Sequence, residues 1–227
     1  MTAIEILDDV RHKELQINFT VARRAFRQEV IPVVVSEFHS LMFHYPIVFL
    51  KDVETGEFAC SALLGINKEA SLLDSMNIEN DESIPLNIRR LPLVAIENQD
   101  NQKRPVVAVN MASASIGQGD CVFKNKSEGF ESAVFALGEL YDGIKETKDY
   151  IKKVIELDLV SKLRAEIRHA DKPAQILEGL YSIDINKIAT IAERDEASKN
   201  TFLEITSFVY AQNFSLVNMK KLANIIS

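Results

Sequence analysis

The chain has 227 residues, 47% of them hydrophobic and 26% charged, which allows a substantial core and excludes disordered and fibrous classes. Its 26 basic and 33 acidic residues give a net charge of −7, and acids outnumber bases on both sides of position 125. Because nucleic-acid binding depends on a basic surface, we expect no nucleic-acid partner.

The first nine residues contain three acids and lack the apolar core of a signal peptide. No stretch approaches the roughly 20 apolar residues that cross a bilayer, so we expect a cytoplasmic protein without a membrane contact. Cys60 and Cys121 are the only cysteines, and each lies in an apolar, strand-like run. We therefore expect two buried thiols without a disulfide.

The first 125 residues predict a mostly β segment with one early helix. Ser36 is the expected N-cap of a short helix over residues 37–45. Pro46 ends this helix, because proline disfavours the helical conformation of the residue before it. Residues 77–83 are acidic and predict a loop.

Two antiparallel hairpins are expected in the same segment. In the first, apolar runs over residues 46–51 and 58–66 flank a turn in which Gly56 can take a positive φ. In the second, apolar runs over residues 91–96 and 105–109 flank the polar connection 97–104.

From Phe130 onward the sequence predicts mostly helix. Apolar residues recur at steps of three, four or seven, which indicates one face of a long amphipathic helix. The residues expected on this core face are Phe130, Val134, Leu137, Tyr141, Ile144, Ile151 and Ile155.

The remaining elements follow a break at residues 172–173. Residues 179–183 predict a short strand, and Asp184 is the expected N-cap of the next helix. Ser215 is expected to cap a terminal helix that runs through Ile226. Between them lies a further helical stripe, formed by Phe202, Ile205, Phe208 and Val209.

These elements together predict an α+β fold. Antiparallel β-hairpins with a short helix form the N-terminal part, and a mostly helical C-terminal half follows. We divide the chain into residues 1–125 and residues 126–227, and expect the two parts to pack together as one compact unit.

The histidines and glycines form no recognisable catalytic or cofactor motif. His39 and His44 are five residues apart, about 140° around a helix, so they cannot form an i, i+4 metal pair. His12 and His169 stand among charged residues and are expected to be solvated. The segment 117–119 lacks the third glycine of a dinucleotide-binding loop and predicts a turn. We expect no catalytic residue, metal or cofactor.

Arg89 and Arg90, between Pro85 and Pro92, are the candidate binding residues. Adjacent arginines that enter a strand point to opposite faces, and a buried guanidinium needs a carboxylate or carbonyl partner. Two interpretations stay open. One arginine forms a structural ion pair with an acid of a neighbouring helix, or the pair clamps an anion or a peptide carboxylate.

Several short blocks in a fixed order resemble the bacterial SapC-like family over nearly the whole chain. They are PIVFLKD (46–52), TGEF (55–58), LLG (63–65), IP (84–85), IRRLP (88–92), the turn 119–123, GLYSID (179–184), YAQ (210–212) and SL (215–216). The chain departs from the family pattern in having no tryptophan, and in lacking acids at residues 110–113 and 124–126.

The resemblance implies an accessory protein without established catalytic residues. It implies genes nearby for outer-membrane receptors and for halogenase-like and cupin-like proteins, which are therefore candidate partners. We expect a non-enzymatic cytoplasmic accessory protein that binds a protein or peptide in a pathway linked to the surface layer or outer-membrane uptake. The alternatives are an enzyme that acts on a peptide or amino-acid-derived substrate, and a structural surface-layer component.

Overall fold

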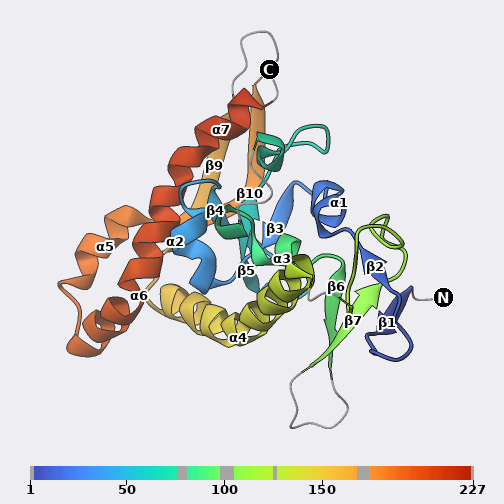
Figure 1. The fold of residues 1–227 in the computed structure, drawn as a ribbon. Coiled ribbons are helices and arrows are strands. Elements are labelled where there is room, and N and C mark those ends of the chain that lie inside the picture. The colour runs from blue at the N-terminus through green and yellow to red at the C-terminus, as the bar shows by residue number, and fades with distance from the viewer. Residues whose placement is uncertain (1–2, 76–80, 98–104, 125–126, 168–173, 226–227) are drawn as a thin grey trace. The chain divides into compact units, whose positions relative to one another are not determined.

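The computed structural model has the α+β architecture that the sequence predicts, with antiparallel sheets in the N-terminal part and a mostly helical C-terminal half (Figure 1). The residues it describes are 3–75, 81–97, 105–124, 127–167 and 174–225. None of the helices within these ranges combines the length and apolar character that crossing a membrane requires.

The chain divides into two compact units, each assembled from two separate stretches of sequence. Unit 1 comprises residues 1–26 and 77–141, and unit 2 comprises residues 27–76 and 142–227. The longest helix, α4 (Glu128–Glu156), begins in unit 1 and ends in unit 2. The expected packing of residues 1–125 with residues 126–227 as one compact body stays a prediction.

Unit 1 is built on two small antiparallel sheets. A three-stranded sheet has the order β1 (Ile4–Ile6), β7 (Val106–Asn110), β6 (Leu93–Ile96). Its β6–β7 pairing confirms the second predicted hairpin. The second sheet pairs the two-residue strands β2 (Gln16–Ile17) and β8 (Asp120–Cys121).

The core of unit 1 joins these strands to helix α4. The short helices of this unit are α1 (Phe19–Arg24) and α3 (Leu86–Arg89). The buried residues that pack together in this core are Ile17, Phe19, Leu93, Val109, Val122, Ala133 and Leu137.

Unit 2 contains a five-stranded antiparallel sheet in the order β3-β5-β4-β10-β9. Its strands are β3 (Val30–Pro32), β4 (Ile47–Lys51), β5 (Phe58–Leu63), β9 (Val160–Ile167) and β10 (Gln175–Ile183). The β4–β5 pairing and the positive φ of Gly56 (72°) confirm the first predicted hairpin. The predicted strand at 179–183 is longer than expected, and β9, its partner, was not predicted.

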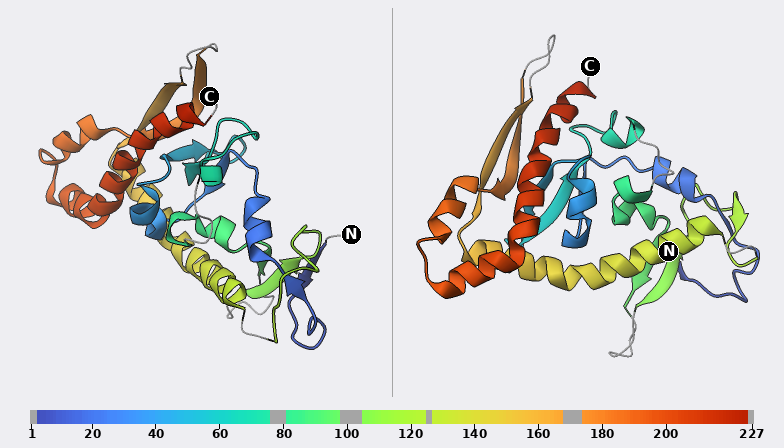
Figure 2. Two further views of the ribbon diagram at one scale, coloured as in Figure 1. Left: turned by 45° about the horizontal axis from the view of Figure 1, so that its top comes forward. Right: turned by 60° about the vertical axis from the view of Figure 1, so that its left-hand side comes forward.

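Four helices complete unit 2 together with the second part of α4. They are α2 (Phe38–Leu41), α5 (Ile185–Ile191), α6 (Glu196–Ser215) and α7 (Met219–Asn224). Both views in Figure 2 show α6 beside the sheet, where it contacts β4 and β10. Asp184 caps α5 as predicted, because its side chain accepts a hydrogen bond from the Asn186 amide (3.1 Å).

The early helix is shorter than predicted, and Ser36 does not cap it. A 3-10 helix (Val35–Glu37) leads directly into α2. The Glu37 carboxylate accepts a hydrogen bond from the Val34 amide (2.9 Å), and so provides the capping that the sequence predicts for Ser36.

Helix α4 buries a different face from the predicted one. Leu137 is buried as expected, but Tyr141, Ile144 and Ile155 are exposed. The buried residues on its inner side are Ala133, Ala136, Leu140, Gly143, Thr147, Tyr150 and Val154. Hydrophobic periodicity gives weight to large side chains and therefore misses a face formed largely by small ones.

Two polar predictions are also wrong. His12 is buried rather than solvated: its Nδ1 accepts a hydrogen bond from the Asp8 amide (3.1 Å), and its Nε2 lies 3.5 Å from the Glu5 carboxylate. Ser215 stands at the N-cap position of a 3-10 helix (Leu216–Asn218) that leads into α7, but its side chain makes no capping hydrogen bond. Its Oγ instead accepts a hydrogen bond from the Ile47 amide.

The two cysteines are free but differ in burial. Cys60 is buried in β5 as predicted, and burial raises the pKa of its thiol. Cys121, in β8, is only half-buried, and its Sγ donates to the Lys13 carbonyl (3.2 Å).

Some expectations fall outside the described residues. These are most of the connection 97–104, residues 77–80 of the acidic segment, the break at 172–173, His169 and the terminal residue Ile226. The described end of the acidic segment forms a 3-10 helix (Asp81–Ser83).

Candidate functional site

Arg89 and Arg90 do not lie at the mouth of a strand as expected. Arg89 ends helix α3, Arg90 is its C-cap, and β6 begins only at Leu93. Pro85 precedes the first turn of this helix, where the fixed φ of proline is compatible with helical backbone. The assumption that both arginines alternate across a strand is therefore wrong.

Arg90 joins α3 to the start of β6. Its Nε donates to the Asn87 side chain (2.9 Å), and its Nη1 donates to the Leu93 carbonyl (2.7 Å). Burial lowers the pKa of the Arg90 guanidinium. The hydrogen bonds to the two neutral acceptors offset part of the cost of burying this charge. The contacts within the described residues thus give Arg90 a structural role without a carboxylate.

Arg89 has different surroundings. Its guanidinium lies over the ring of Phe135, 6.0 Å from the ring centroid, and Phe135 is exposed. The Arg89 carbonyl lies 3.5 Å from Nη2 of Arg23. The structure thus places Arg89 beside the Phe135 ring, and Arg90 beside the Asn87 amide and the Leu93 carbonyl. A binding role for either arginine stays a prediction.

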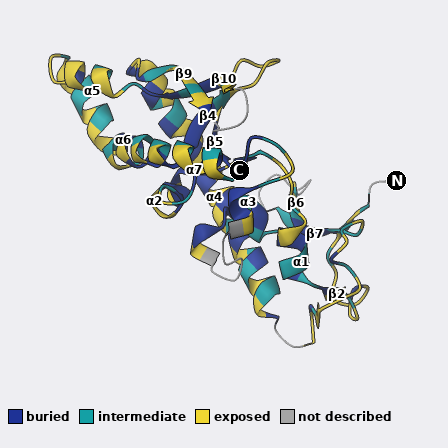
Figure 3. Cartoon of the chain, turned by 90° about the horizontal axis from the view of Figure 1, so that it is seen from above, coloured by how far each residue is buried: buried dark blue, intermediate teal, exposed yellow. Residues whose placement is uncertain are grey.

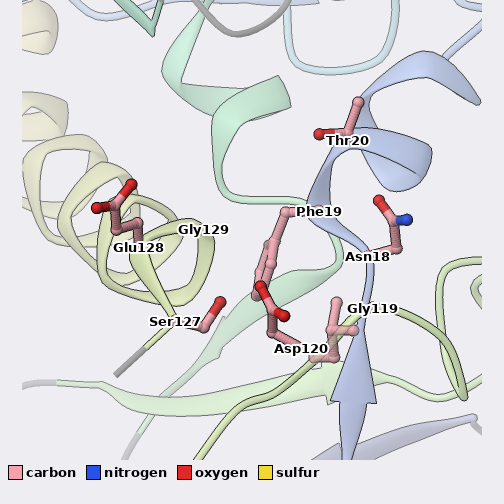
Figure 4. Close-up of a pocket in the computed structure, with 9 residues that line it drawn as sticks. Asn18, Phe19, Thr20, Gly119, Asp120, Ser127, Glu128 and Gly129 are labelled. Carbon is pink, nitrogen blue, oxygen red and sulfur yellow. The ribbon is translucent and has the colours of Figure 1, made fainter. Parts of the chain in front are cut away.

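A polar pocket in unit 1 has a volume of about 510 Å³. Figure 4 shows that its walls come from three places: the β2–α1 junction, the turn before β8 and the start of α4. The predicted glycine turn forms one wall, where Gly119 has φ of 88° and a Cβ would lie 2.7 Å from the Ile17 carbonyl oxygen. Asp120 and Glu128 bring two carboxylates to this pocket, so its charge does not fit an anion.

An apolar groove in unit 2 is another concave site, with a volume of about 490 Å³. We call it the α2–α6 groove. Its walls include His39, Met42 and Phe43 from the α2 side, and Tyr210, Ala211 and Phe214 from α6. The Phe43 and Phe214 rings meet edge to face, with centroids 6.0 Å apart.

Buried hydrogen bonds fix α6 against the rest of unit 2. The Tyr150 hydroxyl donates to Gln212 Oε1 (2.6 Å), and both side chains are buried. Ser215 Oγ accepts from the Ile47 amide of β4 (2.8 Å). Asn218 Nδ2 donates to the Met42 carbonyl (2.7 Å), which ties the end of α2 to the end of α6.

The residues of the segments YAQ (210–212) and SL (215–216) thus occupy two different structural positions. Tyr210 lines the α2–α6 groove, whereas Gln212 and Ser215 belong to the buried hydrogen bonds beneath it. We did not predict this groove from sequence. One signal was available, because residues 205–219 contain no Asp, Glu, Lys or Arg.

Within the described part of the chain, no three His, Cys, Asp or Glu side chains gather in a way that could hold a metal ion. His39 lies within α2, whereas His44 follows the end of this helix. The pKa of His44 is lowered by burial and by the nearby Lys221.

Comparison with known proteins gives one family. The model of the SapC family matches residues 7–222 of the chain. No curated protein and no solved structure matches the chain.

Proposed function

The chain belongs to the SapC family, and from this premise we propose that it is an accessory protein that binds a protein or peptide partner through the α2–α6 groove. The proposed setting is the cytoplasm, in a pathway linked to the surface layer or to outer-membrane uptake. Halogenase-like and cupin-like proteins are candidate partners by family resemblance.

The observation that carries this proposal is the set of exposed aromatic rings in the groove. Phe43, Tyr210 and Phe214 are 54%, 48% and 50% exposed, although aromatic side chains gain free energy on leaving water. Exposed apolar surface of this kind marks interaction sites, and aromatic residues in pockets contribute much of the binding energy at interfaces. The groove therefore supports recognition of an apolar segment of another chain.

The rigidity of the groove supports the same function. Gln212 and Ser215 of α6 form buried hydrogen bonds to α4 and β4, and Asn218, just after α6, donates to the end of α2. Because these hydrogen bonds already order the groove, binding a partner costs little conformational entropy on the side of this protein.

The experiment compares variants of the full-length protein in partner retrieval from its native host, with mass spectrometry of the retained proteins. Tyr210→Ala and Phe214→Ala each remove an exposed ring and leave the buried hydrogen bonds in place. Val53→Ala is the control, because the Val53 side chain is 99% exposed and lies outside the groove.

We expect a protein partner that wild type and Val53→Ala retain. The groove variants should bind this partner about 30-fold more weakly, the effect of losing an interface hot spot. Equal recovery with all four proteins would contradict the proposal. Co-purification of a small molecule without a protein partner would favour the alternative enzyme instead.

A further inference from the structure

An exposed stripe of side chains runs along α6 and continues past its end. It consists of Leu203, Ser207, Tyr210, Phe214 and Val217, all exposed. Figure 3 shows exposed positions along α6 beside buried ones. The opposite face of α6 is buried in unit 2 through Ile205, Val209 and Gln212. We call the exposed set the α6 stripe, and it contains two of the three exposed rings of the α2–α6 groove.

The spacing of the α6 stripe points to the shape of its occupant. Its steps are four, three, four and three residues, which is the heptad pattern of a helix that packs along another helix. At 1.5 Å per residue the stripe is about 21 Å long, the length of about four helical turns. An extended peptide would instead present side chains at every second residue, a period that this stripe does not match.

The charges at the C-terminal end of the stripe have one sign. Residues 205–219 carry no Asp, Glu, Lys or Arg, and the next two residues are the exposed Lys220 and Lys221. Lys221 Nζ donates to the Phe43 carbonyl (2.7 Å), which places its ammonium beside the groove. An occupant with carboxylates at this end would complement these lysines.

A second copy of the chain does not provide that complement. An antiparallel pairing of two α6 stripes centred on Tyr210 sets Lys221 opposite Lys199 of the other copy, and the nearby Glu196 carboxylate of that copy is already bound to Lys199 (2.9 Å). A parallel pairing sets Lys220 opposite Lys220. Both arrangements bring like charges together, which disfavours association.

A bilayer surface is another apolar and anionic environment, but its shape fits less well. The α2–α6 groove is concave, with Phe43 on one wall and Tyr210 and Phe214 on the other. A helix can insert side chains into such a groove, as amphipathic helices do in helix-binding proteins, whereas a bilayer interface is flat.

We infer that the occupant of the α2–α6 groove is an amphipathic helix of about four turns that places acidic side chains against Lys220 and Lys221. This inference rests on the proposed function and specifies the chemistry of the partner. The apolar seam of the helix packs on the α6 stripe, and its acidic end lies at the end of α6.

The test uses a fluorescein-labelled synthetic helix of about 18 residues, with leucine at heptad positions a and d and glutamate at e and g. One matched peptide has the same composition in scrambled order. A second has lysine in place of each glutamate. Fluorescence anisotropy with the full-length chain measures the three affinities.

We expect the wild-type chain to bind the acidic helix roughly tenfold more tightly than the lysine helix, since two ion pairs form in place of two repulsions. The scrambled peptide should bind at least roughly tenfold more weakly as well, because it has no continuous apolar seam to pack on the stripe. The variant Lys220→Glu/Lys221→Glu should prefer the lysine helix, a reversal that loss of structure cannot produce. Lys220→Glu alone should shift the preference in the same direction. The control Lys145→Glu/Lys148→Glu changes two exposed lysines on α4 and should keep the wild-type preference.

Equal affinity for the three peptides would overturn the inference. Binding to vesicles of phosphatidylserine and phosphatidylcholine without binding to the acidic helix would assign the groove to a membrane surface and overturn it as well. Sedimentation showing a dimer that Phe214→Ala dissociates would assign it to a second copy. If a host partner requires Tyr210 and Phe214 but the acidic helix does not bind, the inference fails and the proposed function stands.

Discussion

Two glycines in one helix offer a sharp test of the packing described for α4. A Cβ at Gly143 would lie 2.9 Å from both Cβ and Cγ2 of Val34, closer than real Cβ contacts. Val34 is buried and β-branched, so it cannot easily move aside. A Cβ at Gly138, in contrast, would meet no atom within 4 Å other than those of its own stretch of helix.

The comparison of Gly143→Ala with Gly138→Ala isolates the packing energy. Both changes gain about 0.5–1 kcal/mol of helix propensity, because alanine loses less backbone entropy than glycine. Only Gly143→Ala adds the overpacking cost of about 1–3 kcal/mol. Gly138→Ala should therefore be more stable than wild type, and Gly143→Ala should be less stable than Gly138→Ala by about 1–3 kcal/mol.

Far-ultraviolet circular dichroism provides the assay, because the chain has no tryptophan for fluorescence. A chain of this size shifts its Tm by about 2–4 °C per kcal/mol, so the two variants should differ by at least about 2 °C. If Gly143→Ala melts at the same temperature as Gly138→Ala, the close approach of α4 to Val34 does not exist.

Three further predictions concern the buried polar groups, the thiols and the location of the protein. Tyr150→Phe should destabilise by about 1–3 kcal/mol in urea denaturation, because it leaves the buried Gln212 oxygen without its donor; a loss below about 0.5 kcal/mol would refute this account. In thiol titration of the native protein, Cys121 should react faster than Cys60, since only Cys60 is fully buried; equal rates would contradict that difference in burial. Fractionation of the native host should recover the chain with the cytoplasm, and recovery mainly with membranes or medium would overturn the proposed setting.

The elements set by local signals could be predicted from sequence. The turn at Gly56, the cap at Asp184 and the apolar runs of both hairpins depend on residues that are near one another in the chain. Strand β9 also has a signal in the sequence: charged Lys162 and Arg164 alternate with apolar residues at a period of two.

Predictions that depended on tertiary packing were less successful. The inner face of α4 is formed partly by small residues such as Gly143, so its periodicity is weak and the larger Tyr141 and Ile144 mislead. The arginine pair was placed in a strand because the run after Pro92 is apolar, but Pro85 begins a helical turn instead.

The groove depends on which apolar face of α6 is left uncovered. Phe208 packs among the rings of Phe38 and Tyr150, whereas Tyr210 and Phe214 remain exposed. Because α6 has apolar residues on both sides, its sequence cannot indicate which side the sheet covers.

The central claim is that the α2–α6 groove receives a segment of another protein. The most direct measurement places the photoreactive residue p-benzoylphenylalanine at position 210, and in a control at position 53, in the full-length chain expressed in its native host. We predict that irradiation yields a discrete adduct with one protein from position 210 and none from position 53. Absence of an adduct at position 210, or the same adducts from both positions, would contradict the claim.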